Sequence, residues 1–260
     1  MSDNHDPLDT NGTFVQVSDI GTALSLLSRL PVPASMQTPA RIADAVWAYP
    51  VAGLILGTVT GSFLALLLAL GLPAGPAAGL ALALGTILTG ALHEDGLADC
   101  ADGFWGGGDT ARRLDIMRDS RIGAYGTAAI ALTFLLRWSA LTSLAIVAPF
   151  AALAVTATVA RAPMAMAMVY MPKARRDGLA SSVGTPLPTH AHISALIAVV
   201  VAFLFLGWSA IAVLAITALV AMGFLAIAYK KIGGITGDVL GGCEQISEIA
   251  ILCTLAAVLL

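Results

Sequence analysis

The sequence predicts an all-α protein that crosses a membrane several times, and three observations carry this prediction. Hydrophobic residues make up 58% of the 260 residues and charged residues only 11%, whereas a soluble domain carries about 25% charged residues. The mean hydropathy is +0.89. Apolar runs recur along the chain at lengths that can cross the roughly 30 Å of hydrocarbon in a bilayer. Together these observations exclude a water-soluble globule and a disordered chain.

Charge and cysteine usage exclude further classes. The net charge of −3 provides no basic field, so nucleic acid is not an expected partner. The three cysteines form no C-x-x-C pair and are odd in number, which argues against a disulfide framework and a zinc site. The first 12 residues lack the basic and apolar regions of a signal peptide, so we expect the first span itself to direct insertion.

Residues 1–45 are predicted to form a cytoplasmic N-terminal segment, ahead of a single transmembrane domain at 46–260. Within this segment, residues 14–30 place apolar side chains at the spacing of an amphipathic helix, namely at Phe14, Val17, Ile20, Leu24 and Leu27. The two prolines at Pro31 and Pro33 end the helix. We interpret it as an interfacial helix that lies on the cytoplasmic face of the membrane, with a helix packed on the bundle as the alternative.

About seven transmembrane helices are predicted from the apolar runs. They cover residues 46–70, 75–92, 124–147, 150–171, 192–207, 210–229 and 246–260. The fifth and seventh runs are short, so their ends are the least defined. In the first span, Gly53, Gly57 and Gly61 lie four residues apart and predict a smooth ridge that lets another helix approach closely.

The charged residues lie on one side of this arrangement. With seven spans, the N-terminus shares a side with the connections 92–123, 172–191 and 230–245, which together hold every Lys and Arg except Arg137 and Arg161. The positive-inside rule makes that side cytoplasmic. The two remaining arginines lie inside spans for which no carboxylate partner is predicted. They indicate an anionic ligand or an aqueous cavity, unless the span ends are misplaced or the side chains snorkel.

The connection 92–123 carries the densest set of functional groups. Asp95, Asp99 and Asp102 are spaced i, i+4, i+7 and therefore share one face of a helix. Their mutual repulsion requires a compensating cation. Carboxylate oxygens suit Mg²⁺ or Mn²⁺ better than Zn²⁺.

A second acidic face is predicted just downstream. Thr110 is expected to cap a helix that runs through Ile122, on which Asp115 and Asp119 share a face with Arg112. Two antiparallel helices would then join both acidic faces into a pocket of five carboxylates, ringed by Arg112, Arg113, Arg118 and Arg121. Carboxylates for a metal beside arginines for phosphate suit phosphoryl transfer, whereas the simpler alternative is a solvated loop with surface ion pairs.

These motifs resemble the signature of the adenosylcobinamide-GDP ribazoletransferase family, the cobalamin synthases. The resemblance is carried by Leu92-His93-x-Asp95-Gly96-Leu97-Ala98-Asp99-x-x-Asp102-Gly103 and by Ile116-Met117-Arg118-Asp119-Ser120-Arg121-Ile122-Gly123. Further matches follow in order over nearly the whole chain: Arg29-Leu30-Pro31-Val32-Pro33, Tyr49-Pro50 with Gly53, Arg161-Ala162-Pro163, Ala174-Arg175 with Asp177-Gly178-Leu179, and Gly237-Asp238-Val239-Leu240-Gly241 with Glu244 and Glu248.

The resemblance implies a multi-pass enzyme of the bacterial inner membrane whose site faces the cytoplasm and needs Mg²⁺. It implies that adenosylcobinamide-GDP and α-ribazole, or α-ribazole 5′-phosphate, are joined with release of GMP. The lipid bilayer is the other expected partner, and the sequence leaves open whether the chain forms a homo-oligomer.

Residue roles follow from the motifs and the resemblance together. The predicted metal ligands are Asp95, Asp99, Asp102, Asp115 and Asp119. The predicted substrate-binding residues are Arg112, Arg118, Arg121, Arg161, Arg175 and Asp238. Asp119 and His93 are the predicted catalytic residues, with His93 as a general base for a ribose hydroxyl. The glycine-rich stretch 233–242 is interpreted as a loop or re-entrant segment that anchors Asp238. Glu94 is given no role.

Two alternatives remain open at this stage. The first is an enzyme like the CDP-alcohol phosphotransferases, whose paired acidic motifs Asp99, Asp102, Asp115 and Asp119 fit. Against it, Phe104 and Trp105 stand where that family has Ala-Arg. The second is a transporter of an anionic solute built around Arg137 and Arg161, although the internal repeats common in transporters are absent from the sequence.

Overall fold

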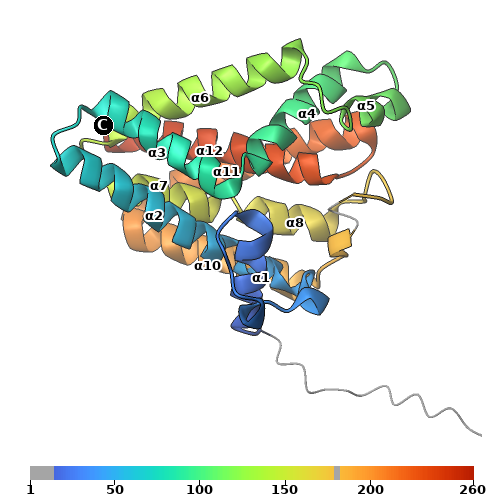
Figure 1. The fold of residues 1–260 in the computed structure, drawn as a ribbon, viewed down its shortest axis with the longest axis horizontal. Helices are drawn as coiled ribbons and strands as arrows, with labels where there is room; N and C mark the ends of the chain where they lie inside the picture. Colours follow the sequence, from blue (N-terminus) through green and yellow to red (C-terminus); the bar gives the residue numbers. More distant parts are fainter. Residues whose placement is uncertain (1–14, 179–181) are drawn as a thin grey trace, which may run out of the picture.

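The computed structural model describes residues 15–178 and 182–260, and helices dominate it (Figure 1). The α-helices are α1 Ser18–Leu27, α2 Tyr49–Ala69, α3 Ala74–Thr89, α4 Leu92–Gly106, α5 Thr110–Ile116, α6 Ala124–Leu144, α7 Pro149–Val159, α8 Ala162–Tyr170, α10 Pro188–Leu206, α11 Ala210–Ile232 and α12 Gly237–Leu259. Three short 3-10 turns, Ala34–Met36, Pro39–Arg41 and Asp44–Ala48, lead into α2, and Gly207–Ser209 joins α10 to α11. The predicted all-α class is confirmed.

Five helical segments in the described residues are long and apolar enough to cross a membrane. They are Asp44–Ala69, Ala124–Leu144, Pro149–Tyr170, Pro188–Ile232 and Gly237–Leu259, and the bent pair of α3 and α4 makes a sixth. Pro188–Ile232 has 45 residues, which as one helix would be about 68 Å long at 1.5 Å per residue. That length is about twice what one crossing needs.

The chain folds back within this long segment. Gly207, between α10 and α11, has a φ of +55°, which ends the regular helix. Ala195 and Ala198 of α10 line the same cavity as Ala218 and Met222 of α11, so the two helices lie side by side. Counted as two crossings, α10 and α11 bring the number of membrane segments among the described residues to the predicted seven.

Two predicted spans contain breaks that their apolar patterns do not show. After α3, Gly90 and Ala91 both adopt left-handed backbone conformations, with φ of +66° and +58°, and α4 leaves at 88° to α3. The fourth span is divided at Ala160 and Arg161 into α7 and α8. The first break turns α4 across the bundle, and the second places an arginine at the level of the break.

The predicted glycine ridge on α2 is confirmed. Cβ atoms added to Gly53, Gly57 and Gly61 would come within 2.1, 2.5 and 2.9 Å of backbone oxygens of α7. Only glycine permits this approach, because real Cβ contacts do not occur at such distances. α2 and α7 therefore pack backbone to backbone.

The N-terminal helix packs on the bundle, which was the alternative to the predicted interfacial placement. Ala23 and Leu27 are buried in a core shared with α2, α8 and α12. Asp19 is fully buried and accepts hydrogen bonds from Arg41 Nε at 3.0 Å and Trp47 Nε1 at 2.9 Å. The helix is shorter than predicted, and Phe14, which was assigned to it, lies outside the described residues.

The predicted connection 230–245 is mostly helical, so that prediction is wrong. α11 continues to Ile232 and α12 begins at Gly237, because Thr236 caps the new helix by accepting a hydrogen bond from Val239 N. Glu244 therefore lies inside a helix. α4, α5 and the segment after α8 gather at one end of the molecule, opposite the α2–α3 turn and the C-terminus (Figure 1).

Candidate active site

Four of the predicted site residues line one cavity. His93 and Asp95 come from α4, Arg175 from the segment after α8, and Asp238 from the first turn of α12. The cavity has a volume of about 210 Å³. Residues far apart in the sequence thus line a single cavity, to which they contribute two carboxylates, one imidazole and one guanidinium.

Glycines bring α4 and α12 close enough to form this cavity. A Cβ at Gly96 would lie 2.7 Å from the carbonyl oxygen of Asp238, and one at Gly241 would lie 3.2 Å from Cα of His93. Because neither glycine has a side chain, the helix backbones approach directly. This contact places the Asp95 and Asp238 carboxylates on neighbouring elements.

Asp238 and Arg175 are held against one another by local structure. Thr236 Oγ1 donates a hydrogen bond to Asp238 Oδ2 at 3.1 Å, and Arg175 Nη2 lies 3.3 Å from the same oxygen. Arg175 follows a short parallel pairing in which Ala174 N donates to Ile235 O at 2.9 Å. The glycine-rich stretch was interpreted as a loop around Asp238, but its residues 237–242 form the start of α12.

Asp99 adds negative charge beside the cavity. It is half-buried, and its carboxylate interacts electrostatically with Asp95, Asp238 and Asp102, while Arg175 is the opposing cation. Four carboxylates around one guanidinium leave an excess of negative charge. Such a donor set fits Mg²⁺, which binds through one or two carboxylates and completes its shell with water and substrate phosphates.

The carboxylates do not form a closed protein cage. Among the described residues, no three Asp, Glu, His or Cys side chains lie close enough together to hold one metal ion. The five predicted carboxylates therefore do not meet in one pocket within the described part of the chain, and their assignment as Mg²⁺ ligands stays a prediction. Binding of Mg²⁺ by Asp95 and Asp99 stays a prediction that relies on further ligands from the substrate.

Asp102 is engaged by the start of α6. Its two oxygens accept hydrogen bonds from Gly123 N at 2.7 Å and Gly126 N at 2.9 Å. A Cβ at either glycine would lie 2.4 Å from an Asp102 oxygen, so a larger residue at either position would displace the Asp102 carboxylate. Asp102 thereby satisfies two backbone donors that a helix N-terminus leaves free.

The second acidic motif lies outside the cavity. α5 ends at Ile116, six residues before its predicted end, and Asp109 rather than Thr110 caps it by accepting a hydrogen bond from Arg112 N at 2.9 Å. Arg112 and Asp115 are exposed. The glycine turn and the early helix end keep this face from meeting the aspartates of α4.

Asp119 and the remaining arginines form surface ion pairs. Hydrogen bonds from the Arg121 side chain lower the pKa of Asp119 to about 2, and the two groups lie 2.7 Å apart. The pairing with Arg121 keeps Asp119 ionised, and its catalytic role stays a prediction. Arg118 pairs with Asp177 at 2.6 Å, and Asp177 lies 4.0 Å from Arg175. Leu179 of the same motif lies outside the described residues.

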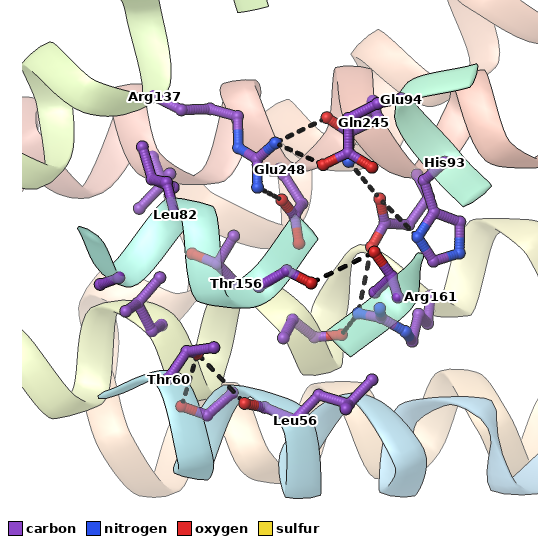
Figure 2. Close-up of a pocket in the computed structure, with 18 residues that line it drawn as sticks. Leu56, Thr60, Leu82, His93, Glu94, Arg137, Thr156, Arg161, Gln245 and Glu248 are labelled. Atoms are coloured by element: carbon purple, nitrogen blue, oxygen red, sulfur yellow. Dashed lines mark hydrogen bonds and ion pairs between the residues drawn. The ribbon is translucent and has the colours of Figure 1, made fainter. Parts of the chain in front are cut away.

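A buried ionic cluster lies beside the cavity, inside the bundle (Figure 2). Arg137 of α6 lies 2.6 Å from Glu248 and 3.4 Å from Glu94, and it donates a hydrogen bond to Gln245 Oε1 at 2.8 Å. These four residues come from α4, α6 and α12. The cluster therefore joins three helices through charged groups that are almost entirely shielded from solvent.

The second intramembrane arginine is also paired. Arg161 Nη1 lies 3.0 Å from Glu244 Oε1 and donates to the carbonyl oxygen of Ala157 at 2.6 Å. The arginine is 2% exposed. The expectation that Arg137 and Arg161 lack carboxylate partners inside the spans is thus wrong. Arg161, predicted to bind substrate, lies in this cluster and does not line the cavity of about 210 Å³ that contains Asp95 and Asp238.

His93 connects the cluster with the cavity. Its Nδ1 lies 3.7 Å from Glu244 Oε2, and its side chain lines both the larger cavity and a hollow of about 40 Å³ within the cluster. Figure 2 shows the other ring nitrogen turned away from the cluster. That atom, Nε2, is buried without a hydrogen-bond partner in the described part of the chain.

No pairing of Glu94, Glu244 and Glu248 with the intramembrane arginines was predicted from the sequence. Glu94 precedes Asp95, so on a helix its side chain points about 100° away, toward the bundle. Glu244 and Glu248 are spaced i, i+4 and share a face of α12. The sequence pattern that could have revealed the cluster is the presence of these glutamates beside apolar spans, together with two arginines inside other predicted spans.

Comparisons with known proteins agree with the motifs. A family model described as cobalamin-5-phosphate synthase matches residues 19–256. A relative from Mesorhizobium japonicum, named adenosylcobinamide-GDP ribazoletransferase, is 42% identical over 238 residues, which cover 91% of this chain and 92% of the relative. One of the same name from Bradyrhizobium diazoefficiens is 44% identical, with 93% and 94% covered. No solved structure matches the chain. The chain belongs to the cobalamin-5-phosphate synthase family.

Proposed function

We propose that the chain joins adenosylcobinamide-GDP to α-ribazole, or to α-ribazole 5′-phosphate, and releases GMP. The observation that carries the proposal is the cavity lined by His93, Asp95, Arg175 and Asp238 in a chain of this family. A ribose hydroxyl of the acceptor attacks the phosphorus next to the cobinamide. The bond from that phosphorus to the bridging oxygen breaks, and GMP leaves with the bond electrons.

Each charged group of the cavity has a task in this displacement. His93, whose Nε2 is unpartnered, accepts the proton of the attacking hydroxyl. Arg175 presents a guanidinium that can clamp phosphate oxygens. Asp95 and Asp99 would hold Mg²⁺, which when bound stabilises negative charge on the phosphates and on the leaving group. Asp238 keeps Arg175 in place through their 3.3 Å contact.

We place the enzyme in the bacterial inner membrane with this cavity open to the cytoplasm. The charged connections support the orientation because α4, α5 and the segment after α8 lie at one end of the molecule (Figure 1). Lys and Arg in short connections favour the cytoplasmic side. The water-soluble substrates would then reach the site from the cytoplasm without crossing the bilayer.

Neither alternative from the sequence is favoured by the geometry. A CDP-alcohol phosphotransferase would draw its second acidic pair from Asp115 and Asp119, which are exposed and apart from the cavity. A transporter was argued from unpaired arginines, but Arg137 and Arg161 pair with glutamates.

The direct test is an assay of the purified protein in detergent. Adenosylcobinamide-GDP and α-ribazole are incubated with the enzyme at a range of Mg²⁺ concentrations, and GMP and the joined corrinoid are measured. We expect both products in equal amounts, and only with Mg²⁺ present. Formation of neither product, or of GMP from the donor without joining to the acceptor, would overturn the proposal.

A further inference from the structure

We propose that the cavity is the acceptor subsite, and that the base of the acceptor nucleoside packs on an apolar wall built by α1, α2 and α8. Its ribose then faces His93 and Asp95 on the opposite wall. This inference rests on the proposed function and adds to it the place and the orientation of one of the two substrates.

The apolar wall is well defined. It is formed by Leu26 and Leu27 of α1, Tyr49 at the start of α2, and Met164 and Met168 of α8. All except Leu26 are at most 4% exposed and belong to one hydrophobic core. These side chains therefore have fixed neighbours, and they form a preformed surface for an apolar group.

The position of α1 in this wall is fixed by the chain that follows it. Arg29 N donates a hydrogen bond to the carbonyl oxygen of Leu88 at 2.7 Å, which ties the end of α1 to the end of α3. A Cβ at Gly90 would lie 2.4 Å from Arg29 Nε, so the Arg29 side chain also packs closely there. Leu26 and Leu27 are thus held over the cavity.

The charged groups come from other elements than this wall, and these elements also contribute Leu92 and Leu240 to the lining. His93 and Asp95 come from α4, Asp238 from α12, and Arg175 from the segment paired with Ile235. A ligand that fills the cavity must present an apolar body to one wall and polar groups to the other. A nucleoside has this division between its base and its ribose.

The chemistry of the wall selects the acceptor over the donor. The base of α-ribazole is a dimethylated benzimidazole, which is flat and has no amino or carbonyl substituent. Guanine has both, and burying them against leucine and methionine without hydrogen-bond partners is costly. Methionine sulfur in addition packs favourably on aromatic rings, and Met164 and Met168 supply two such groups.

The size of the cavity agrees with this choice. Pockets for drug-sized ligands measure about 300–1,000 Å³, whereas this cavity is about 210 Å³. It can take a bicyclic base and adjoining ribose atoms. A corrin ring that carries a nucleotide is far larger, so the donor would bring only its diphosphate to the charged wall.

The test uses substitutions that fill the cavity from α8. Met164→Phe and Met168→Phe put larger side chains into the wall. Met166→Phe is the matched control because Met166 lines a different cavity, of about 370 Å³, between α8, α10 and α11. The KM of each substrate is measured at saturating concentration of the other, with Mg²⁺ present.

We expect both cavity variants to raise the KM for α-ribazole about tenfold or more, which corresponds to about 1.4 kcal/mol of binding. The KM for adenosylcobinamide-GDP should stay within about twofold of wild type, as should both constants in Met166→Phe. A rise confined to the KM of the donor would show that the donor packs on this wall. Wild-type KM values for both substrates would show that the base of the acceptor does not bind in this cavity. Either result overturns the inference while leaving the proposed function intact.

A complementary variant excludes misfolding as the cause. Leu27→Ala enlarges the wall, so it should accept the α-ribonucleoside of naphthimidazole, a base with one more fused ring, better than wild type does. The readout is the ratio of kcat/KM for the naphthimidazole and dimethylbenzimidazole nucleosides. An increase of about tenfold in that ratio is expected, and an unchanged ratio in an active Leu27→Ala enzyme would contradict the placement of the base.

Discussion

Asp99 and Asp102 lie three residues apart on α4, and their surroundings assign them different tasks. Asp99 stands among other carboxylates beside the cavity. Both oxygens of Asp102 accept backbone N–H groups of α6. A shared helix face therefore does not imply a shared role.

The two residues should respond differently to the same substitution. We expect Asp99→Asn to lower the rate by about 10²–10⁴ through loss of preorganised charge and to leave thermal unfolding in detergent unchanged. Asp102→Asn replaces one accepting oxygen by an N–H donor that faces another donor, which should lower the free energy of unfolding by about 1–3 kcal/mol. Rates at several Mg²⁺ concentrations complete the comparison. A normal unfolding temperature with a raised Mg²⁺ requirement in Asp102→Asn would show that Asp102 is a metal ligand after all.

Arg137 is expected to be a stability residue. Removing one member of a buried ion pair leaves an uncompensated charge, which costs about 3–5 kcal/mol, whereas replacing both members with apolar groups is often neutral. Arg137→Met should therefore destabilise the protein strongly. Arg137→Met combined with Glu248→Leu should recover a part of the loss. Thermal unfolding in detergent measures both, and additive losses in the double variant would argue against the 2.6 Å ion pair.

At the scale of elements, the contact of α4 with α12 decides the geometry of the cavity. The bend after α3 directs α4 across the bundle, and glycines then let it approach α12 without intervening side chains. The charged residues of the cavity depend on this contact because they project from both helices near their crossing.

Gly96→Ala tests this contact. The new Cβ would lie 2.7 Å from the Asp238 carbonyl oxygen, so α4 and α12 must separate, at a cost of about 1–3 kcal/mol. We expect activity to fall at least tenfold, because Asp95 and Asp238 move apart. Gly223→Ala in α11 is the control, since its Cβ would have no neighbour within 4 Å. Equal activities of the two variants would mean that the helix contact does not control the site.

At the scale of the whole molecule, one end of the bundle holds the charged connections (Figure 1). This predicts the orientation in the membrane. Reporter domains inserted after Gly71, Ala148 and Gly207 should read as periplasmic, and those after Gly108 and Gly233 as cytoplasmic. A periplasmic signal at Gly108 would place the cavity on the wrong side for its proposed substrates.

The sequence by itself determined the class of the protein, its division into several apolar spans and the glycine ridge of α2. These properties depend on the transfer of local apolar segments into the bilayer and on the residues of one helix face, which a linear pattern records. The acidic stripe of α4 was also readable, because Asp95, Asp99 and Asp102 share one helix. The family signature then added the expected reaction.

The tertiary structure decided which helix faces meet. It paired Arg137 and Arg161 with glutamates from α4 and α12, and it separated Asp115 and Asp119 from the cavity because α5 ends at Ile116. It also turned Asp102 toward the N-terminus of α6. None of these contacts is local, since each depends on the bend after α3 and on close packing between helices far apart in the sequence. A periodic pattern states which face of a helix is polar, whereas the partner of that face is chosen by the packing of the whole bundle.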